Sequence, residues 1–139
     1  MSKKIACSAV LALVGLSATT YAMPPRPETC PAVANIQAAG LSYSTIGTKG
    51  YTVAQLNNYS TANTWVFGFT SIKANSTEDA LKIGAELLST LYGTPKPEPI
   101  VAYNLWACFY QTIQGNYGLA ITPVNATGNL TQSLNAVIR

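Results

Sequence analysis

The sequence predicts an α+β domain in which an antiparallel sheet of about five strands packs against helices. Three observations support this fold class: a change from helical to period-two spacing after Gly40, an aromatic-rich alternating run over 64–72, and an amphipathic run over 76–92. Short turns between neighbouring strand segments favour antiparallel pairing, and helices that interrupt such a sheet pack on its face. The expected order of elements is α-β-β-β-α-β-β-α.

Residues 1–22 have the pattern of a cleaved signal peptide, which belongs to export rather than to the fold. Lys3 and Lys4 precede an apolar stretch over 5–16, and Ala22 ends a small-residue segment suited to signal peptidase. The alternative, a membrane anchor, needs about 20 apolar residues, and this stretch is shorter. We expect an exported protein of bacterial type, periplasmic or secreted, with no membrane span in its mature chain.

The mature chain is expected to begin with an extended leader over 23–29 and to continue as a single α+β domain over 30–139. The leader is rich in proline, which prevents a regular element there. The segment 30–40 then predicts a short helix, since Pro31 suits a first helical turn and Gly40 suits a helix end.

Five segments have the alternation, or the β-branched and aromatic composition, that is typical of strands. They are 41–46, 51–56, 64–72, 100–113 and 117–122. The first two flank a Gly-bounded turn and predict a hairpin, and the last two flank a short loop over 114–116 and predict another. The Pro-rich stretch 96–99 is interpreted as a stiff connector.

The clearest helix of the chain follows Ser76. Ser76 is the expected N-cap, and Asp79 three residues later completes a capping box. Apolar residues recur at three- and four-residue spacing up to Leu91, and Gly93 before a proline-rich stretch ends the helix. The tail over 129–139 has a second pattern of this kind and predicts a final helix that closes the domain. Its apolar positions are Leu130, Leu134 and Val137.

Two cysteines, Cys30 and Cys108, belong to the mature chain. A pair of cysteines in an exported protein is best interpreted as a disulfide, which would pin the first helix to the sheet. It would close a loop over most of the mature chain and stabilise the fold by roughly 4 kcal/mol through loop-closure entropy. The alternative is that Cys30, which precedes a proline, offers a thiolate to haem iron; this requires a reduced cysteine in an oxidising compartment.

The composition argues against catalysis, metal binding and nucleic-acid binding. The chain has no histidine, so His-ligated zinc, His-ligated haem and every catalytic triad with an imidazole base are excluded. Loss of Lys3 and Lys4 with the signal lowers the formal net charge from +3 to +1, too small to attract phosphate. We therefore expect no enzyme and no metal site.

The carboxylates of the mature chain are few, and each has a structural interpretation in a leader, helix terminus, polar helix face or connector. They are Glu28, Glu78, Asp79, Glu86 and Glu98. A small hydrolase would need two of them in one cleft as general acid and base, or a lysine to activate a nucleophile. Neither arrangement is indicated by the spacing of these residues.

Aromatic side chains are the remaining candidates for function. Trp106 and Tyr110 alternate onto the strand face of Cys108, opposite Leu105 and Phe109. If helices cover only one face of the sheet, the other becomes an aromatic platform for a flat apolar ligand or a partner protein. The alternative is that these side chains pack in the core. The candidate ligand-binding residues are Tyr103, Trp106 and Tyr110, and a tyrosine phenolate is the one conventional haem ligand that the composition allows.

Four stretches of the mature chain carry a family resemblance: Cys-Pro-Ala-Val-Ala-Asn-Ile-Gln over 30–37, Asn-Thr-Trp-Val-Phe over 63–67, Asn-Leu-Trp-Ala-Cys over 104–108, and Gly-Leu-Ala-Ile-Thr-Pro over 118–123. The chain resembles a family of small exported Legionella-type proteins of unknown function, some of which are labelled hemin-binding protein. The resemblance covers about 30–123. It implies a periplasmic or secreted location and association with hemin, and it brings no catalytic or ligand residues.

The sequence therefore predicts an exported, non-enzymatic binding protein that associates with hemin, or with another flat apolar ligand, through an aromatic and apolar surface. The alternative is an exported protein–protein interaction factor, such as an inhibitor or a host-directed virulence factor, that acts through a sheet edge or an aromatic patch. Neither interpretation calls for a resident cofactor, a nucleic-acid partner or a membrane span.

Overall fold

The computed structural model describes residues 23–124. The elements in this range are α2 (Val33–Ala39), β1 (Tyr43–Gly47), β2 (Gly50–Asn57), β3 (Trp65–Ile72), α3 (Thr77–Ser89), β4 (Glu98–Ile100), the 3₁₀ helix η2 (Val101–Tyr103), β5 (Leu105–Gln111) and β6 (Tyr117–Thr122). The predicted signal peptide over 1–22 and the predicted helix over 129–139 lie outside the described residues.

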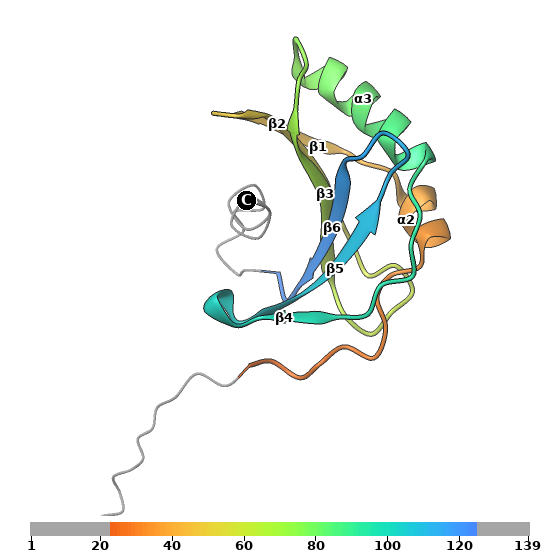
Figure 1. Cartoon of the computed structure of the whole chain (residues 1–139), viewed down its shortest axis with the longest axis vertical. Helices are drawn as coiled ribbons and strands as arrows, with labels where there is room; N and C mark the ends of the chain where they lie inside the picture. The colour runs from red at the N-terminus through yellow and green to blue at the C-terminus, as the bar shows by residue number, and fades with distance from the viewer. Residues whose placement is uncertain (1–22, 125–139) are drawn as a thin grey trace, which may run out of the picture.

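The strands form one antiparallel sheet of six, in the order β1-β2-β3-β6-β5-β4. The last strand in sequence, β6, lies between β3 and β5, so the two halves of the sheet are joined at its centre. The described sheet is curved rather than closed, with α2 and α3 on its convex side (Figure 1). The predicted α+β class is confirmed, and β4 is the strand that the prediction of about five did not include.

The region 96–113 differs from its prediction. The stretch 96–99, expected as a connector, contributes β4, and the strand expected over 100–113 is interrupted by η2 and starts only at Leu105. Asn104 has a φ of 54°, in the left-handed region that asparagine tolerates better than most residues, and the chain reverses there. Ile100 consequently pairs with Leu105. Pro99 is accommodated because β4 is an edge strand of the described sheet.

Helix α3 begins as predicted. The amide of Asp79 donates to Ser76 Oγ at 3.0 Å, as in a capping box, and Asp79 Oδ2 accepts the amide of Asn75, the residue before the N-cap, at 3.1 Å. A Cβ at Gly84 would lie 2.9 Å from a methyl group of Val53, so glycine is what lets α3 approach β2 this closely. The helix ends at Ser89, and the chain continues as an extended segment that bonds to the edge of β5.

The main core lies between the helices and the sheet. Its buried members come from both layers and include Ile36, Leu87, Leu88 and Leu91 from the helices and the segment after α3, and Tyr51, Val53, Trp65, Phe67, Phe69, Cys108 and Tyr110 from the strands. The predicted disulfide is present, with an S–S distance of 2.02 Å between Cys30 and Cys108. Because Cys30 stands just before α2 and Cys108 lies in β5, the bond holds α2 over this face of the sheet.

Candidate functional site

Tyr110, one of the predicted ligand-binding residues, is a core side chain. It is completely buried, its hydroxyl donates to the carbonyl oxygen of Pro31 at 2.5 Å, and its ring packs edge-to-face on Phe67 with centroids 5.8 Å apart. Burial, together with the neighbouring Tyr59, raises the pKa of Tyr110 well above its ordinary value. The phenol is therefore neutral at physiological pH and supplies no phenolate.

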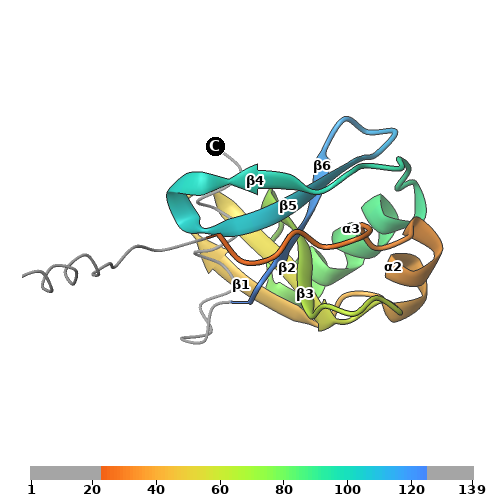
Figure 2. The same ribbon diagram turned by 90° about the horizontal axis from the view of Figure 1, so that it is seen from below.

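Trp106 is half-buried beneath the leader. Its indole N–H donates to the carbonyl oxygen of Pro24 at 2.9 Å, and the guanidinium of Arg26 lies 5.9 Å from the ring centroid. Arg26 Nη2 also donates to the carbonyl oxygen of Pro97 at 3.3 Å. Figure 2 shows the leader passing β5 on its way to α2. The leader contains no helix or strand over 23–29, and it occupies the position that a ligand of Trp106 would need.

Tyr103 is 51% exposed and lies in η2, at the turn between β4 and β5. The structure therefore does not bring Tyr103, Trp106 and Tyr110 to one surface. The reason is the disulfide, which draws the leader and α2 onto the face of β5 that carries Cys108. Any open aromatic surface of β5 has to lie on the opposite, concave side of the sheet.

The concave side has a continuous group of apolar strand residues, which we call the apolar floor. Its members are Ala54, Val66, Leu105, Ala107, Leu119 and Ile121, each with an exposed fraction of 7% or less. The register aligns them across four strands. Ala54 and Leu119 both pair with Gly68 of β3, and Val66 and Ala107 both pair with Ile121 of β6. Phe109 and Val124 are partly buried against the floor.

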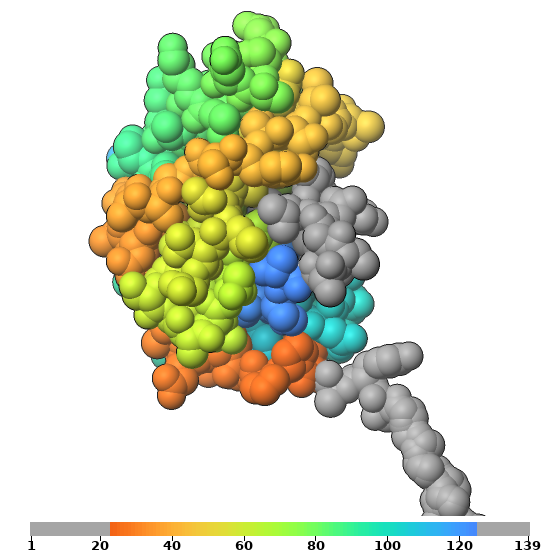
Figure 3. All heavy atoms as spheres, turned by 180° about the vertical axis from the view of Figure 1, so that it is seen from behind, coloured from red at the N-terminus to blue at the C-terminus, as the bar shows by residue number. Residues whose placement is uncertain are grey.

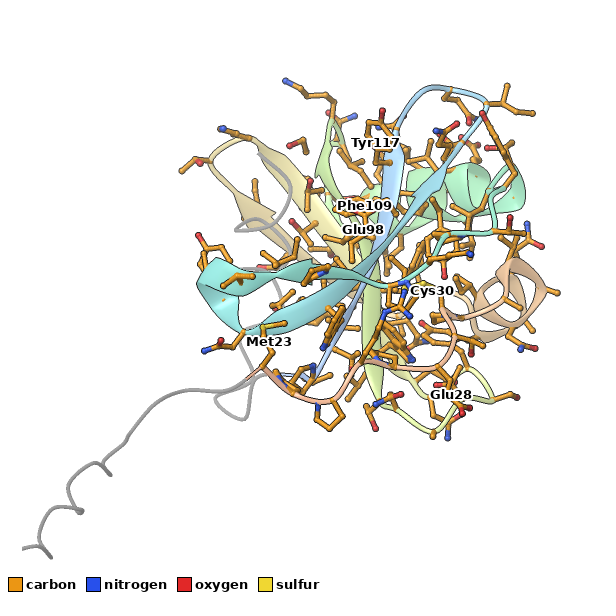
Figure 4. The ribbon with its side chains drawn as sticks, turned by 60° about the horizontal axis from the view of Figure 1, so that its bottom comes forward. Met23, Glu28, Cys30, Glu98, Phe109 and Tyr117 are labelled. Atoms are coloured by element: carbon orange, nitrogen blue, oxygen red, sulfur yellow. A yellow bond between two sulfur atoms is a disulfide. The ribbon has the colours of Figure 1, made fainter. Side chains whose placement is uncertain are left out.

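An aromatic row borders the apolar floor toward the β5–β6 hairpin loop, and we call Tyr92, Phe109 and Tyr117 the aromatic strip. Gln111 pairs with Tyr117 on one side and bridges to Tyr92 on the other. Directly opposed residues of antiparallel strands point to the same face, and residues two apart on one strand also share a face. Figure 4 shows Phe109 and Tyr117 in succession along this side of the sheet, with Glu98 beyond them.

Backbone contacts hold the aromatic strip in place. Tyr92 and Gln111 exchange two backbone hydrogen bonds of 2.8 and 3.0 Å, and the Tyr92 hydroxyl donates to Gln111 Oε1 at 2.8 Å. Next to Tyr117, a Cβ at Gly118 would come within 2.8 Å of the Phe67 ring, so β6 lies tightly on the main core. Tyr92 and Tyr117 remain 50% and 57% exposed. The two tyrosines of the strip are thus exposed aromatic side chains on a hydrogen-bonded, closely packed support.

The sequence did not reveal the aromatic strip. Tyr92 follows an amphipathic helix and was expected at its end, whereas the structure places it at the edge of β5, 19 residues before its partner Gln111. The alternation of β5 does place Phe109 and Gln111 on one face, which is the local signal for part of the strip. The bridge from Tyr92 is a non-local contact that has no signature in the spacing.

A groove of about 550 Å³ lies between the leader, the start of α2 and the stretch 93–97. It is lined by the charged residues Arg26, Glu28 and Lys96 together with prolines and Cys30. A smaller groove of about 320 Å³ lies between the leader and residues 60–63. Figure 3 shows the leader below this loop on the reverse side of the molecule. Both grooves include the opposite charges of Arg26 and Glu28, and the larger groove adds the cation of Lys96.

The carboxylates of the described residues lie in different parts of the fold. Glu78 and Asp79 are at the start of α3, Glu86 is on its exposed face, Glu98 is in β4, and Glu28 is in the leader. Within residues 23–124, no group of three or more histidine, cysteine, aspartate or glutamate side chains is placed to hold a metal ion. No helix in this part of the chain is both long and apolar enough to span a membrane.

The fold and the strip define a disulfide-linked α+β domain with two helices on the convex face of a six-stranded sheet and aromatic residues on its concave face. The chain belongs to the family described as Domain of unknown function (DUF4949), which matches residues 29–131. No curated protein and no solved structure matches the chain. The predicted membership of a family of unknown function is confirmed, and association with hemin stays a prediction.

Proposed function

We propose that this protein is an exported, non-enzymatic binding protein that takes a flat apolar ligand on the aromatic strip, and that hemin is that ligand. The observation that carries the proposal is the exposure of Tyr92 and Tyr117 on either side of Gln111, on backbone that is hydrogen-bonded into the sheet. Export rests on the signal peptide predicted over 1–22. The disulfide is consistent with an oxidising compartment.

The geometry of the strip suits a planar ligand. Opposed side chains in a sheet stand about 5 Å apart, so the row from Tyr92 through Gln111 to Tyr117 is about 10 Å wide. Phe109 lies next to this row and adjoins the apolar floor. Exposed aromatic side chains beside an apolar surface favour stacking and burial of a flat ring system over binding of a polar solute.

Tyrosine also provides the chemistry for contact with the iron of hemin. A phenolate is an established haem ligand, and the chain has no histidine to compete with it. Burial raises the pKa of both Tyr59 and Tyr110, which disfavours their phenolates. Tyr117 is open to solvent, whereas the Tyr92 hydroxyl is engaged with Gln111. We therefore assign the contact with iron to Tyr117 and the stacking surface to Tyr92 and Phe109.

The experiment is a titration of hemin into the mature chain, 23–139, followed by the Soret band. We expect saturable binding that weakens at least tenfold when Tyr92 and Tyr117 are both replaced by alanine. Tyr103→Ala is the matched control, because Tyr103 is equally exposed but lies outside the strip. Tyr117→Phe keeps the ring and removes the oxygen, so it should change the position of the Soret band more than the affinity.

Two results would overturn this proposal. One is a Soret change that does not saturate, which indicates adhesion of hemin to apolar surface in general. The other is equal weakening by Tyr103→Ala and by the strip variants, which would remove the strip as the binding surface.

A second function, binding of a partner protein through a sheet edge, is favoured by β1. This strand is an edge of the described sheet, and Ile46 on it is 66% exposed. An open edge can pair with an extended segment of another protein. If this is the function, Ile46→Asp should abolish capture of an exported partner by the mature chain, and Tyr117→Ala should leave capture unchanged. The reverse result would favour the strip.

A further inference from the structure

The apolar floor is a cluster of apolar strand residues that the described helices do not cover. Both α2 and α3 pack on the convex side of the sheet, whereas the floor faces the concave side (Figure 1). Its six side chains include no polar group, and every one of them is buried. The described helices do not account for this burial, and an apolar segment on the concave side would keep the floor from water, whose contact costs about 25 cal/mol per Å² of apolar surface.

The chain leaves the sheet at this surface. β6 ends at Thr122, whose hydroxyl donates to the carbonyl oxygen of Thr64 at 2.7 Å and so fixes the exit point beside β3. Ile121 belongs to the floor, and Val124, the last described residue, packs against it. The described chain therefore ends in contact with the floor.

The remaining 125–139 has the length and pattern to cover this surface. Leu130, Leu134 and Val137 recur at i, i+4 and i+7, which places them on one side of a helix. A helix over 129–139 would be about 16 Å long, and strands are about 4.8 Å apart, so it can cross three strands. Gln132 and Asn135 would face away from this apolar side.

We propose that residues 125–139 fold back onto the apolar floor as an amphipathic helix and form the second layer of the core on the concave side. The other occupant to consider is a second copy of the chain. A tethered segment has an effective concentration in the millimolar range for a short linker, well above that of a second copy in a dilute solution. Tethering therefore favours the segment of the same chain.

The experiment uses the mature chain with a benzoylphenylalanine in place of Leu134 as a photo-crosslinker, and maps the products by mass spectrometry. We expect crosslinks within one chain to strands β3, β5 and β6. The control carries the same group at Gln132, which the proposal places on the solvent side, and should give at least fivefold less product to these strands. Crosslinks to α2 or α3, or crosslinks only between chains, would overturn the proposal.

A second measurement uses natural amino acids only and needs no photo-crosslinker. Leu134→Asp should increase hydrogen exchange in β6 and binding of an apolar dye, and Gln132→Asp, which adds the same charge, should change neither by more than the error. If Leu134→Asp fails to fold, Leu134→Ala gives the same comparison in a milder form. Equal exchange in the Leu134 and Gln132 variants would contradict docking on the floor. Neither experiment contains hemin, so its outcome does not depend on the proposed function.

Discussion

The hydroxyl of Tyr110 donates to the carbonyl oxygen of Pro31 inside the main core, across 79 residues of sequence. This bond lies beside the disulfide, because Pro31 follows Cys30 and Tyr110 is two residues after Cys108. The start of α2 is thus held to β5 by one covalent bond and one buried hydrogen bond. A residue that sequence reasoning assigned to a ligand therefore joins two layers of the fold.

Tyr110→Phe should destabilise the protein without altering its proposed ligand binding. The substitution leaves the buried carbonyl of Pro31 without its donor, which costs about 1–3 kcal/mol in free energy of unfolding. The measurement is urea unfolding followed by far-UV circular dichroism. Tyr103→Phe is the control and should change stability by less than about 0.5 kcal/mol, because its side chain is exposed. Equal stability of the Tyr110→Phe variant and the wild type would show that this bond contributes nothing.

Stability should fall as the pH rises above about 10, the ordinary pKa of tyrosine. Burial raises the pKa of Tyr59 and Tyr110 in the folded protein, so the unfolded chain loses these protons first. The stabilisation is fully present below pH 10 and is lost as the pH rises toward the folded pKa. Urea unfolding at pH 9, 10 and 11 measures the change. Tyr110→Phe removes one of the two groups and should show a shallower decline; an identical slope would argue against a buried, neutral Tyr110.

Loss of the disulfide should lower stability by up to roughly 4 kcal/mol. Cys30 and Cys108 are 78 residues apart, and in the chain-entropy model the bond restricts the unfolded state over this whole loop. Thermal unfolding of the oxidised and reduced mature chain gives the comparison. The variant in which both cysteines are serine should match the reduced protein. An unchanged melting temperature after verified reduction is the contradicting result.

Gly84→Ala should destabilise the protein, although alanine is the better helix former by about 1 kcal/mol. The new Cβ would lie 2.9 Å from a methyl group of Val53 and 3.0 Å from one of Leu41, and such overpacking typically costs about 1–3 kcal/mol. Chemical unfolding of the single variants and of Gly84→Ala with Val53→Ala forms a double-mutant cycle. We expect the cost of Gly84→Ala to shrink when Val53 is shortened, and additive costs would contradict the close approach of α3 to β2.

Local sequence signals determined most of the secondary structure. The Ser76 and Asp79 capping box identified the start of α3, and the Gly-bounded turn before Tyr51 identified the β1–β2 hairpin. These signals act within a few residues, so no tertiary contact is needed to interpret them. The chain reversal at Asn104 was not predicted, because apolar residues continue on both sides of it. A single residue in the left-handed conformation leaves no periodic pattern in the sequence.

The sequence by itself determined that β5 has two faces, one with Trp106, Cys108 and Tyr110 and the other with Leu105 and Phe109. Only the tertiary structure decided which face the helices cover. Alternation is symmetric with respect to the two sides of a strand, and the choice between them depends on non-local contacts. Here two non-local contacts make that choice. The disulfide from Cys30 to Cys108 holds α2 over one face, and the bridge from Tyr92 to Gln111 adds Tyr92 to the aromatic strip on the other.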